Sequence, residues 1–322
     1  MSQNQQLRIG WVGFHMEGIP ALRALIDAGH KPVVVLTLKP TALEKRSGRI
    51  FYKEIFASDQ LDIREIGNVN DPDAQEILRS AQLDVLFVIG WSQILKPETL
   101  SLARLGVIGA HASYLPKNRG SAPINWAIIN GETSTGNSLM WLDASVDAGD
   151  IIDQMPFAIE PYDTCETLYQ KVAQTNAAMI LRAVQRIAAG ERPGVPQAHG
   201  NDPLLARRRP EDGLIDWSQP ARRVYDFIRA LTRPYPGGFS WLNGRKHFVW
   251  NAALPGLHST AAAPGAVLGP CYSPTEAACG QVVQCGDGPI ILLEVEEEGG
   301  QILRGKNLSE ANWKGTQWKP QP

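Results

Sequence analysis

The stretch GVIGAHASYLPKNRGSAPINWAIINGE, residues 106–132, places a histidine at the end of an apolar run and follows it with a rigid loop. Residues 106–113 predict a β-strand, and residues 122–131 predict a helix that ends on a glycine. In open parallel sheets, ligands bind beyond the carboxyl ends of the strands. His111 is therefore a candidate functional residue, and the alternative is a histidine that serves only as a structural hydrogen-bonding partner.

Strand and helix patterns alternate on both sides of this stretch. Alternation of this kind predicts an α/β fold, a Rossmann-like, mostly parallel sheet with helices on both faces. The predicted strands are residues 7–14, 31–38, 83–90, 106–113 and 137–143. The predicted helices are residues 19–29, 71–81, 97–104, 122–131 and 164–190.

The composition of the sequence changes after residue 190. Residues 191–213 are rich in proline, glycine and charge, which is typical of an interdomain linker. A helix is expected over residues 216–231, followed by short strands between glycines and prolines. The chain is thus expected to consist of a catalytic domain, residues 1–200, and a smaller, mainly-β, OB-like domain with a tail, residues 201–322.

The composition limits the classes of protein to which this chain can belong. The 322 residues are 43% hydrophobic and 20% charged, with a formal charge of −2, so no overall basic field indicates nucleic acid. No apolar run approaches the ~18 residues of a membrane span, and no secretory signal is recognisable, so a cytoplasmic location is expected. The four cysteines show no metal-binding spacing, and no metal is expected.

A glycine-rich turn follows the first strand. Its pattern, Gly10-x-x-Gly13-x-x-x-x-Gly18, differs from the G-x-G-x-x-G of dinucleotide-binding folds, and the second strand ends without an acidic residue. A tight turn without a nucleotide role is the better interpretation. His15 and Glu17 at its tip are candidates for contact with a substrate.

Acidic residues in a second loop give His111 a candidate partner. The sequence WLDASVDAGDII, residues 141–152, predicts a strand and then a loop with acids at 143, 147 and 150. A carboxylate on a neighbouring loop can orient an imidazole and raise its pKa, so that the ring accepts a proton near neutral pH. Solvated loop residues are the alternative for these acids.

These motifs resemble the folate-dependent formyltransferase family, which includes glycinamide ribonucleotide, methionyl-tRNA and amino-sugar formyltransferases. The resemblance rests on His111-Ala-Ser-Tyr-Leu-Pro with Arg119-Gly120 and Pro123, on Asn130-Gly131-Glu132-x-x-Thr135-Gly136, and on Asp147-Ala-Gly-Asp150. Residues 215–250 also resemble the start of the second domain of the tRNA and amino-sugar enzymes, so the resemblance covers nearly the whole chain.

The resemblance implies an N-formyltransferase that uses 10-formyltetrahydrofolate as cosubstrate and moves its formyl group to a primary amine. His111 would be the catalytic histidine and Asp147 its carboxylate partner. The pterin would lie between two loops, formed by Trp91, Ser92, Gln93, Ile94 and Leu95 and by Leu142, Asp143, Ala144, Ser145 and Val146. His15, Ser113, Arg119 and Gly120 would contact the acceptor.

One position departs from the family pattern. Most members carry an asparagine two residues before the histidine, where it helps to hold the tetrahedral oxyanion, and this chain has Gly109. Protonated His111, a backbone N–H, a water, Asn125 or Asn137 could replace the missing donor. Because some relatives that lack the asparagine are hydrolases, a 10-formyltetrahydrofolate hydrolase and a catalytically impaired folate-binding module stay open.

The charge balance of the C-terminal part indicates which kind of formyl acceptor to expect. From Arg207 onward the chain has 13 Lys and Arg against 11 Asp and Glu, and residues 207–209 form the one dense basic cluster. Because tRNA binding uses many phosphate contacts, this balance favours the amine of a small molecule, with a nucleotide-linked amino sugar as the first expectation. Methionyl-tRNA is the alternative partner. No membrane partner is expected, and a homodimer stays open.

Overall fold

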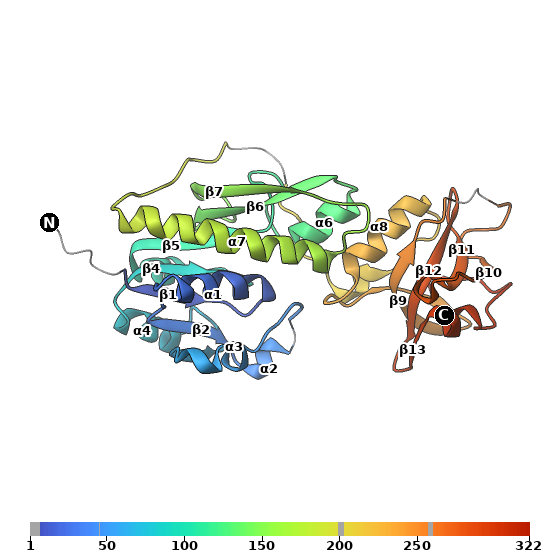
Figure 1. The fold of residues 1–322 in the computed structure, drawn as a ribbon, viewed down its shortest axis with the longest axis horizontal. Helices are drawn as coiled ribbons and strands as arrows, with labels where there is room; N and C mark the ends of the chain where they lie inside the picture. The colour runs from blue at the N-terminus through green and yellow to red at the C-terminus, as the bar shows by residue number, and fades with distance from the viewer. Residues whose placement is uncertain (1–6, 45, 199–202, 257–259) are drawn as a thin grey trace. The chain divides into compact units, whose positions relative to one another are not determined.

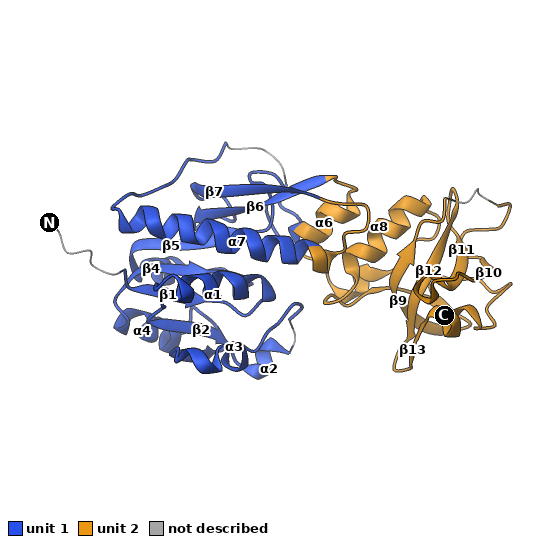
Figure 2. Cartoon of the chain, in the orientation of Figure 1, with its two compact units in different colours: residues 1–123, 134–158, 168–206 blue, residues 124–133, 159–167, 207–322 orange. Residues whose placement is uncertain are grey.

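The computed structural model describes residues 7–44, 46–198, 203–256 and 260–322. The chain forms two compact units (Figure 2), and each of them is made of three segments. Unit 1 comprises Met1–Pro123, Ser134–Ala158 and Leu168–Ala206, and unit 2 comprises Ile124–Thr133, Ile159–Thr167 and Arg207–Pro322. The last change of unit, at 206/207, lies close to the 200/201 boundary expected from the sequence, but unit 2 also takes two short segments from the first half of the chain.

Unit 1 is built on a seven-stranded sheet with the order β3-β2-β1-β4-β5-β6-β7. The first five strands in this order, β3, β2, β1, β4 and β5, are parallel. The strand β6 runs antiparallel to β5, and β7 runs antiparallel to β6. The strands are β1 (Ile9–Val12), β2 (Val34–Leu38), β3 (Ile63–Ile66), β4 (Leu83–Val88), β5 (Ala103–His111), β6 (Ser134–Trp141) and β7 (Ile151–Ala158). The predicted mostly parallel sheet is confirmed.

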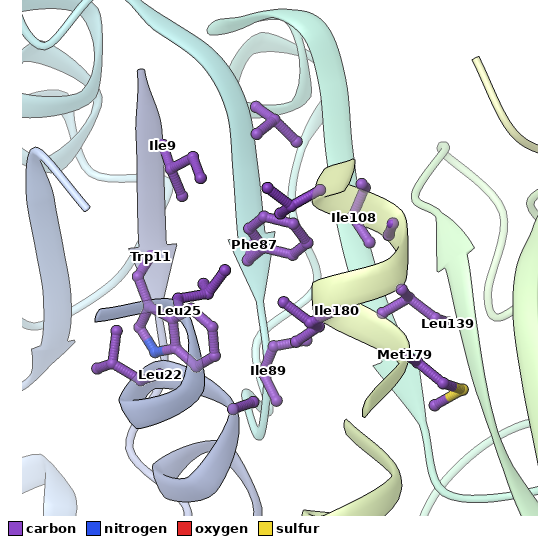
Figure 3. Close-up of a cluster of buried hydrophobic side chains, with 14 of the residues drawn as sticks. Ile9, Trp11, Leu22, Leu25, Phe87, Ile89, Ile108, Leu139, Met179 and Ile180 are labelled. Carbon is purple, nitrogen blue, oxygen red and sulfur yellow. The ribbon is translucent and has the colours of Figure 1, made fainter. Parts of the chain in front are cut away.

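Helices cover both faces of this sheet (Figure 1). On one face, Trp11, Phe87 and Ile108 pack against α1 and α7, as Figure 3 shows. On the other face, Val12 and Val107 pack with α4. The helices of unit 1 are α1 (Ile19–Asp27), α2 (Pro40–Leu43), α3 (Tyr52–Ile55), α4 (Pro72–Ser80), α5 (Pro97–Leu100) and, from Leu168 on, α7 (Cys165–Ala188), with 3-10 turns η1 (Met16–Gly18) and η2 (Ala57–Asp59). The helix α6 (Pro123–Ile129) lies in unit 2 except for its first residue.

The central strands form where apolar side chains run without interruption. All five residues of β2, VVLTL, are buried, as a strand covered on both faces requires. The strand β7 has an interrupted pattern, IIDQMPFA, because it lies at the edge of the sheet, and the sequence pattern did not indicate it. Pro156 is tolerated there, since an edge strand leaves some backbone groups unpaired.

Two predicted helices are shorter in the structure by four residues or more. The helix expected over residues 97–104 ends at Leu100, because Ala103 already pairs with Leu83 in β4. The helix expected over residues 216–231 begins at Ala221. The residues before it form a turn in which the Asp216 carboxylate accepts the Ser218 N–H at 3.0 Å, and Pro220 precedes the first helical residue.

Unit 2 is mainly β, as expected. Its antiparallel sheet has the order β10-β11-β12-β9-β8, and β13 pairs with β12. The elements are η3 (Pro210–Gly213), α8 (Ala221–Leu231), β8 (Gly238–Leu242), β9 (Arg245–Ala253), β10 (Val267–Cys271), η4 (Glu276–Ala278), β11 (Gly280–Gln284), β12 (Pro289–Glu297), β13 (Ile302–Arg304) and α9 (Gly305–Ser309). The apolar face of α8 packs in one core with this sheet.

Within unit 2, the segment 124–133 is joined to α8 by a buried hydrogen bond. The Asn125 side-chain amide donates to the Ala230 carbonyl at 2.6 Å. In the residues that the structure describes, no helix has the length and apolar character needed to cross a membrane.

Candidate active site

His111 is the last residue of β5, and its side chain is 9% exposed. Its Nε2 lies 2.8 Å from the carbonyl oxygen of Asn118, in the loop that follows the strand. Because side chains alternate along a strand, His111 and Gly109 share a face of the sheet with Val107, which packs in the α4-side core. The His111 side chain therefore lies on that face.

The loop after β6 brings the second ionisable group to this face. Since β6 is antiparallel to β5, Trp141 lies opposite Ile108, three residues before the end of β5. The Trp141 N–H donates to the Asp150 carbonyl at 3.0 Å and closes the loop at its base. At position 149 a Cβ would lie 1.7 Å from the Trp141 oxygen, so only glycine allows this approach.

Asp147 meets His111 in the structure. Its Oδ2 lies 3.5 Å from His111 Nδ1 and accepts the Gly120 N–H at 2.9 Å. Asp147 has a φ of +51°, in the left-handed region that few non-glycine residues adopt. Two loops that are 36 residues apart in the chain thus place an imidazole and a carboxylate side by side.

The partners of the ring fix where protons can reside. The Asn118 carbonyl only accepts, so His111 Nε2 carries a hydrogen in this arrangement. The Asp147 carboxylate also only accepts, so a hydrogen on Nδ1 faces it. A substrate atom that exchanges a proton with Nε2 must replace the Asn118 carbonyl.

Leucine occupies the space beside Gly109. A Cβ built at position 109 would lie 2.6 Å from Leu142 Cδ2, so a larger residue requires Leu142 to move. Asn137 faces the other side of the sheet, where its amide nitrogen donates to Asn176 at 2.7 Å. The Asn125 amide nitrogen donates to Ala230 within unit 2. Both amide groups considered as replacements for the missing donor are thus engaged elsewhere.

The loop after β4 combines structural and exposed residues. Trp91 and Leu95 pack in the α4-side core, which Leu142 also contacts, so the two loops expected to enclose a pterin adjoin one cluster. Gln93 braces the loop, because its side chain accepts from Val69 N and donates to Gly67 O, both at 2.9 Å. Ser92 is exposed, and Ile94 is 73% exposed although it is apolar.

The loop after β6 also presents exposed side chains. Asp143 accepts the Ser145 N–H at 2.7 Å and so shapes the turn. Ala144 and Ser145 are exposed, and Val146 is 38% exposed. Ile94 and Val146 thus expose apolar side chains on the two loops expected to enclose a pterin, and apolar surface is what a flat heterocycle contacts.

The residues expected to contact an acceptor lie in different settings. Ser113 is buried and donates from Oγ to the Lys117 carbonyl at 2.7 Å, so its hydroxyl braces the loop. Gly120 holds Asp147, and the Arg119 carbonyl accepts the Leu205 N–H at 2.8 Å. His15 lies after β1, with its ring 4.9 Å from the ring of Tyr169 in α7.

His15, which is buried, and Glu17, which is partly buried, lie side by side next to the β1 turn. The Nδ1 of His15 accepts the Glu17 N–H at 3.4 Å, and the Oε2 of Glu17 is buried without a hydrogen-bond partner. Burial lowers the pKa of His15 to about 4 and raises the pKa of Glu17 to about 7. Although Nδ1 and Oε1 are 3.8 Å apart, both groups are therefore neutral at mildly acidic pH and do not form an ion pair.

The raised pKa of Glu17 predicts a pH-dependent effect of Glu17→Gln. Wild-type protein loses stability as the pH rises from the ordinary glutamate pKa of 4.5 to about 7, because folded Glu17 must ionise without a partner. The variant lacks this loss, so it is expected to match wild type near pH 4.5 and to be more stable above pH 7, on the order of 3 kcal/mol. Urea unfolding between pH 4.5 and 8 measures the difference, with the exposed Glu98→Gln as control. An equal difference at every pH contradicts the assignment.

Comparisons with known proteins agree with this fold. Residues 20–184 match the family model described as formyl transferase, and residues 208–312 match the formyl transferase C-terminal domain. The chain is 32% identical over 312 residues to a methionyl-tRNA formyltransferase of Solibacter usitatus, covering 94% of this chain and 97% of that protein. The chain belongs to the formyltransferase family, a family of enzymes, and the resemblance inferred from the sequence is confirmed.

Solved structures share the fold at lower sequence identity. HypX from Aquifex aeolicus, crystallised with tetrahydrofolic acid, is 18% identical with a TM-score of 0.66, covering 93% of this chain and 46% of that one. An N-formyltransferase from Helicobacter canadensis, in complex with folinic acid and dTDP-3-aminofucose, is 17% identical with a TM-score of 0.63, covering 89% of this chain and 98% of that one.

Proposed function

We propose that this chain transfers the formyl group of 10-formyltetrahydrofolate to the primary amine of a nucleotide-linked amino sugar. The observation that carries the proposal is the meeting of His111 and Asp147, 3.5 Å apart, on the face of the sheet that also holds the Trp91 and Leu142 loops. Folates in the solved structures of similar fold support this choice of formyl donor.

In the proposed reaction, the amine nitrogen bonds to the formyl carbon, and the bond from that carbon to N10 of the folate breaks. Once the substrate replaces the Asn118 carbonyl at His111 Nε2, the ring holds its hydrogen on Nδ1, facing Asp147. Nε2 then takes up the proton that the amine loses and returns it to the leaving nitrogen. Asp147 stabilises the imidazolium that forms in between. Because position 109 offers no side-chain donor, the developing oxyanion relies on His111 Nε2–H or on backbone N–H groups.

The charges of unit 2 favour a small acceptor over tRNA. Three of its cations are neutralised by glutamates of β12 and the residue after it: Arg233 pairs with Glu294 at 2.6 Å, Arg245 with Glu297 at 2.7 Å and Lys246 with Glu298 at 2.9 Å. In the basic cluster, the Arg208 guanidinium stacks on Trp126 at 5.0 Å. Tight tRNA binding draws on many phosphate contacts, and these pairings leave fewer cations available for them.

Methionyl-tRNA is the second candidate acceptor, because a relative of that name matches 94% of the chain at 32% identity. Hydrolysis of the folate is the third candidate reaction, because position 109 lacks the usual side-chain donor and the side chain of Leu142 lies beside it.

An acceptor panel tests the proposal. Purified protein and 10-formyltetrahydrofolate are incubated with dTDP- and UDP-linked 3- and 4-amino sugars, with methionyl-tRNA, or with no acceptor, and formation of tetrahydrofolate and of the formamide is measured. Formylation of an amino sugar is expected, with rates that change less than about tenfold between 50 and 200 mM salt. Formylation of tRNA with a loss of roughly 10³-fold or more over that range, or turnover that does not require an acceptor, would replace the proposal with one of the alternatives.

A further inference from the structure

The segment after α7 is attached to the sheet of unit 1, although its composition is that of a linker. The Arg192 guanidinium lies 4.3 Å from the centre of the Trp141 ring, and Trp141 Nε1 donates to the Pro193 carbonyl at 2.6 Å. Val195 exchanges two backbone hydrogen bonds with Ile151 of β7, at 2.8 and 2.9 Å. These contacts place residues 192–195 beside the base of the Asp147 loop.

Gln197 continues from this attachment into the loop. The residue is 7% exposed, and its Nε2 donates to the carbonyl oxygens of Asp147 at 3.1 Å and of Gly149 at 2.8 Å. One amide group thus ties together the two ends of a turn that begins with a residue in the left-handed conformation. A backbone in this sparsely populated region persists when the surroundings hold it.

We propose that Gln197 is a positioning residue for Asp147, and through it for His111. The inference rests on the proposed function, in which Asp147 stabilises protonated His111. Asp147 is held from two sides: Gln197 binds its main-chain carbonyl, and the Gly120 N–H binds its carboxylate. Without the Gln197 amide, the turn can relax, and Oδ2 moves relative to His111 Nδ1.

The same stretch of chain also supports the second arm of the site. The Leu205 N–H donates to the Arg119 carbonyl at 2.8 Å, and the Leu205 carbonyl accepts the Ser121 N–H at 3.1 Å. These bonds flank Gly120, where a Cβ would lie 2.6 Å from Leu205 N. Gln197 thus fixes the loop that carries Asp147. Leu205 fixes the loop that carries Gly120, whose N–H binds the Asp147 carboxylate.

The test compares Gln197→Met with a matched substitution. Methionine has a similar length and no donor, so the variant removes the two hydrogen bonds with little change in volume. Gln281→Met is the control, because the buried Gln281 amide likewise donates to backbone carbonyls, those of Leu308, Ser309 and Ala311, in unit 2. Both variants lose similar hydrogen bonds, but only one of them lies in the site.

The first measurement does not depend on activity. The ring signals of His111 are followed by NMR at fixed pH, with the assignment made by their loss in His111→Ala. Gln197→Met is expected to move these signals in the same direction as Asp147→Asn, by a smaller amount, and Gln281→Met is expected to leave them unchanged. Wild-type signals in Gln197→Met, or an equal shift in both glutamine variants, would overturn the inference. If Gln197→Met does not fold, Gln197→Ala takes its place.

The second measurement is kinetic. Gln197→Met is expected to lower kcat by roughly 10- to 100-fold with little change in KM, since displacing a catalytic group by about 1 Å costs up to about 10²-fold. In an Asp147→Asn background the same substitution should have no further effect. An undiminished effect in that background overturns the inference. If wild-type protein formylates no acceptor, the proposed function fails, whereas the NMR measurement still decides the role of Gln197.

Discussion

Replacing His111 with alanine is expected to lower kcat/KM for formyl transfer by roughly 10²- to 10⁴-fold, the contribution typical of general acid–base catalysis. Asp147→Asn should come close to this loss, because it removes the charge that stabilises protonated His111. Binding of the folate should be retained in both variants. Steady-state kinetics with the best acceptor of the panel, together with folate binding by calorimetry, measures the two effects.

The fold should tolerate both substitutions. The His111 ring has a hydrogen bond to a single backbone carbonyl, that of Asn118, so its loss costs about 1 kcal/mol. His247→Ala is a matched control, because His247 is also buried and its Nδ1 lies 3.0 Å from the Arg245 carbonyl in unit 2. That variant should lose similar stability and keep its activity. A much larger loss of Tm in His111→Ala would indicate a structural histidine instead.

Restoring a side-chain amide at position 109 is expected to raise the rate only when Leu142 is reduced in size. Gly109→Asn alone should lower stability by about 1–3 kcal/mol through overpacking, because the new Cβ meets Leu142 Cδ2 at 2.6 Å. In the double variant with Leu142→Ala, the amide gains room on the face that His111 shares. One added oxyanion donor is worth roughly 10²- to 10³-fold in kcat.

The comparison that isolates this effect is the double variant against Leu142→Ala, since both lack the leucine. Single-turnover rates with saturating folate separate the chemical step from binding. A gain in the double variant identifies formyl transfer as limited by the missing donor. Equal rates would show that another group, such as His111 Nε2–H or a backbone N–H, already fills that role, and that Gly109 reflects a different acceptor geometry.

Much of unit 1 could be predicted because its patterns are local. A short window of sequence is enough to recognise the continuous apolar run of β2 and the amphipathic pattern of α7. The juxtaposition of His111 and Asp147 could be anticipated because each follows a strand with a clear pattern. In contrast, the strands β3 and β7 lie at the two edges of the sheet and lack a continuous apolar run.

Other features depend on contacts between distant residues. Gln197 lies 50 residues after Asp147 in a stretch whose prolines and glycines indicate a linker, and no local signal marks a glutamine that binds two carbonyls. The space filled by Leu142 beside Gly109 likewise depends on how one loop crosses a neighbouring strand. Periodicity describes which face a residue occupies, but it does not describe which loop covers that face.

The division of unit 2 into three chain segments has a consequence for synthesis and for truncation. Asn125 and Trp126 leave the ribosome some 80 residues before the first residue of the long C-terminal segment, and their partners Ala230 and Arg208 come later still. A chain cut after Ala206 would keep an asparagine and a tryptophan that have lost these partners. A cut at this point therefore removes only part of the second unit, and an isolated N-terminal fragment is expected to show a greater tendency to aggregate than its sheet alone would suggest.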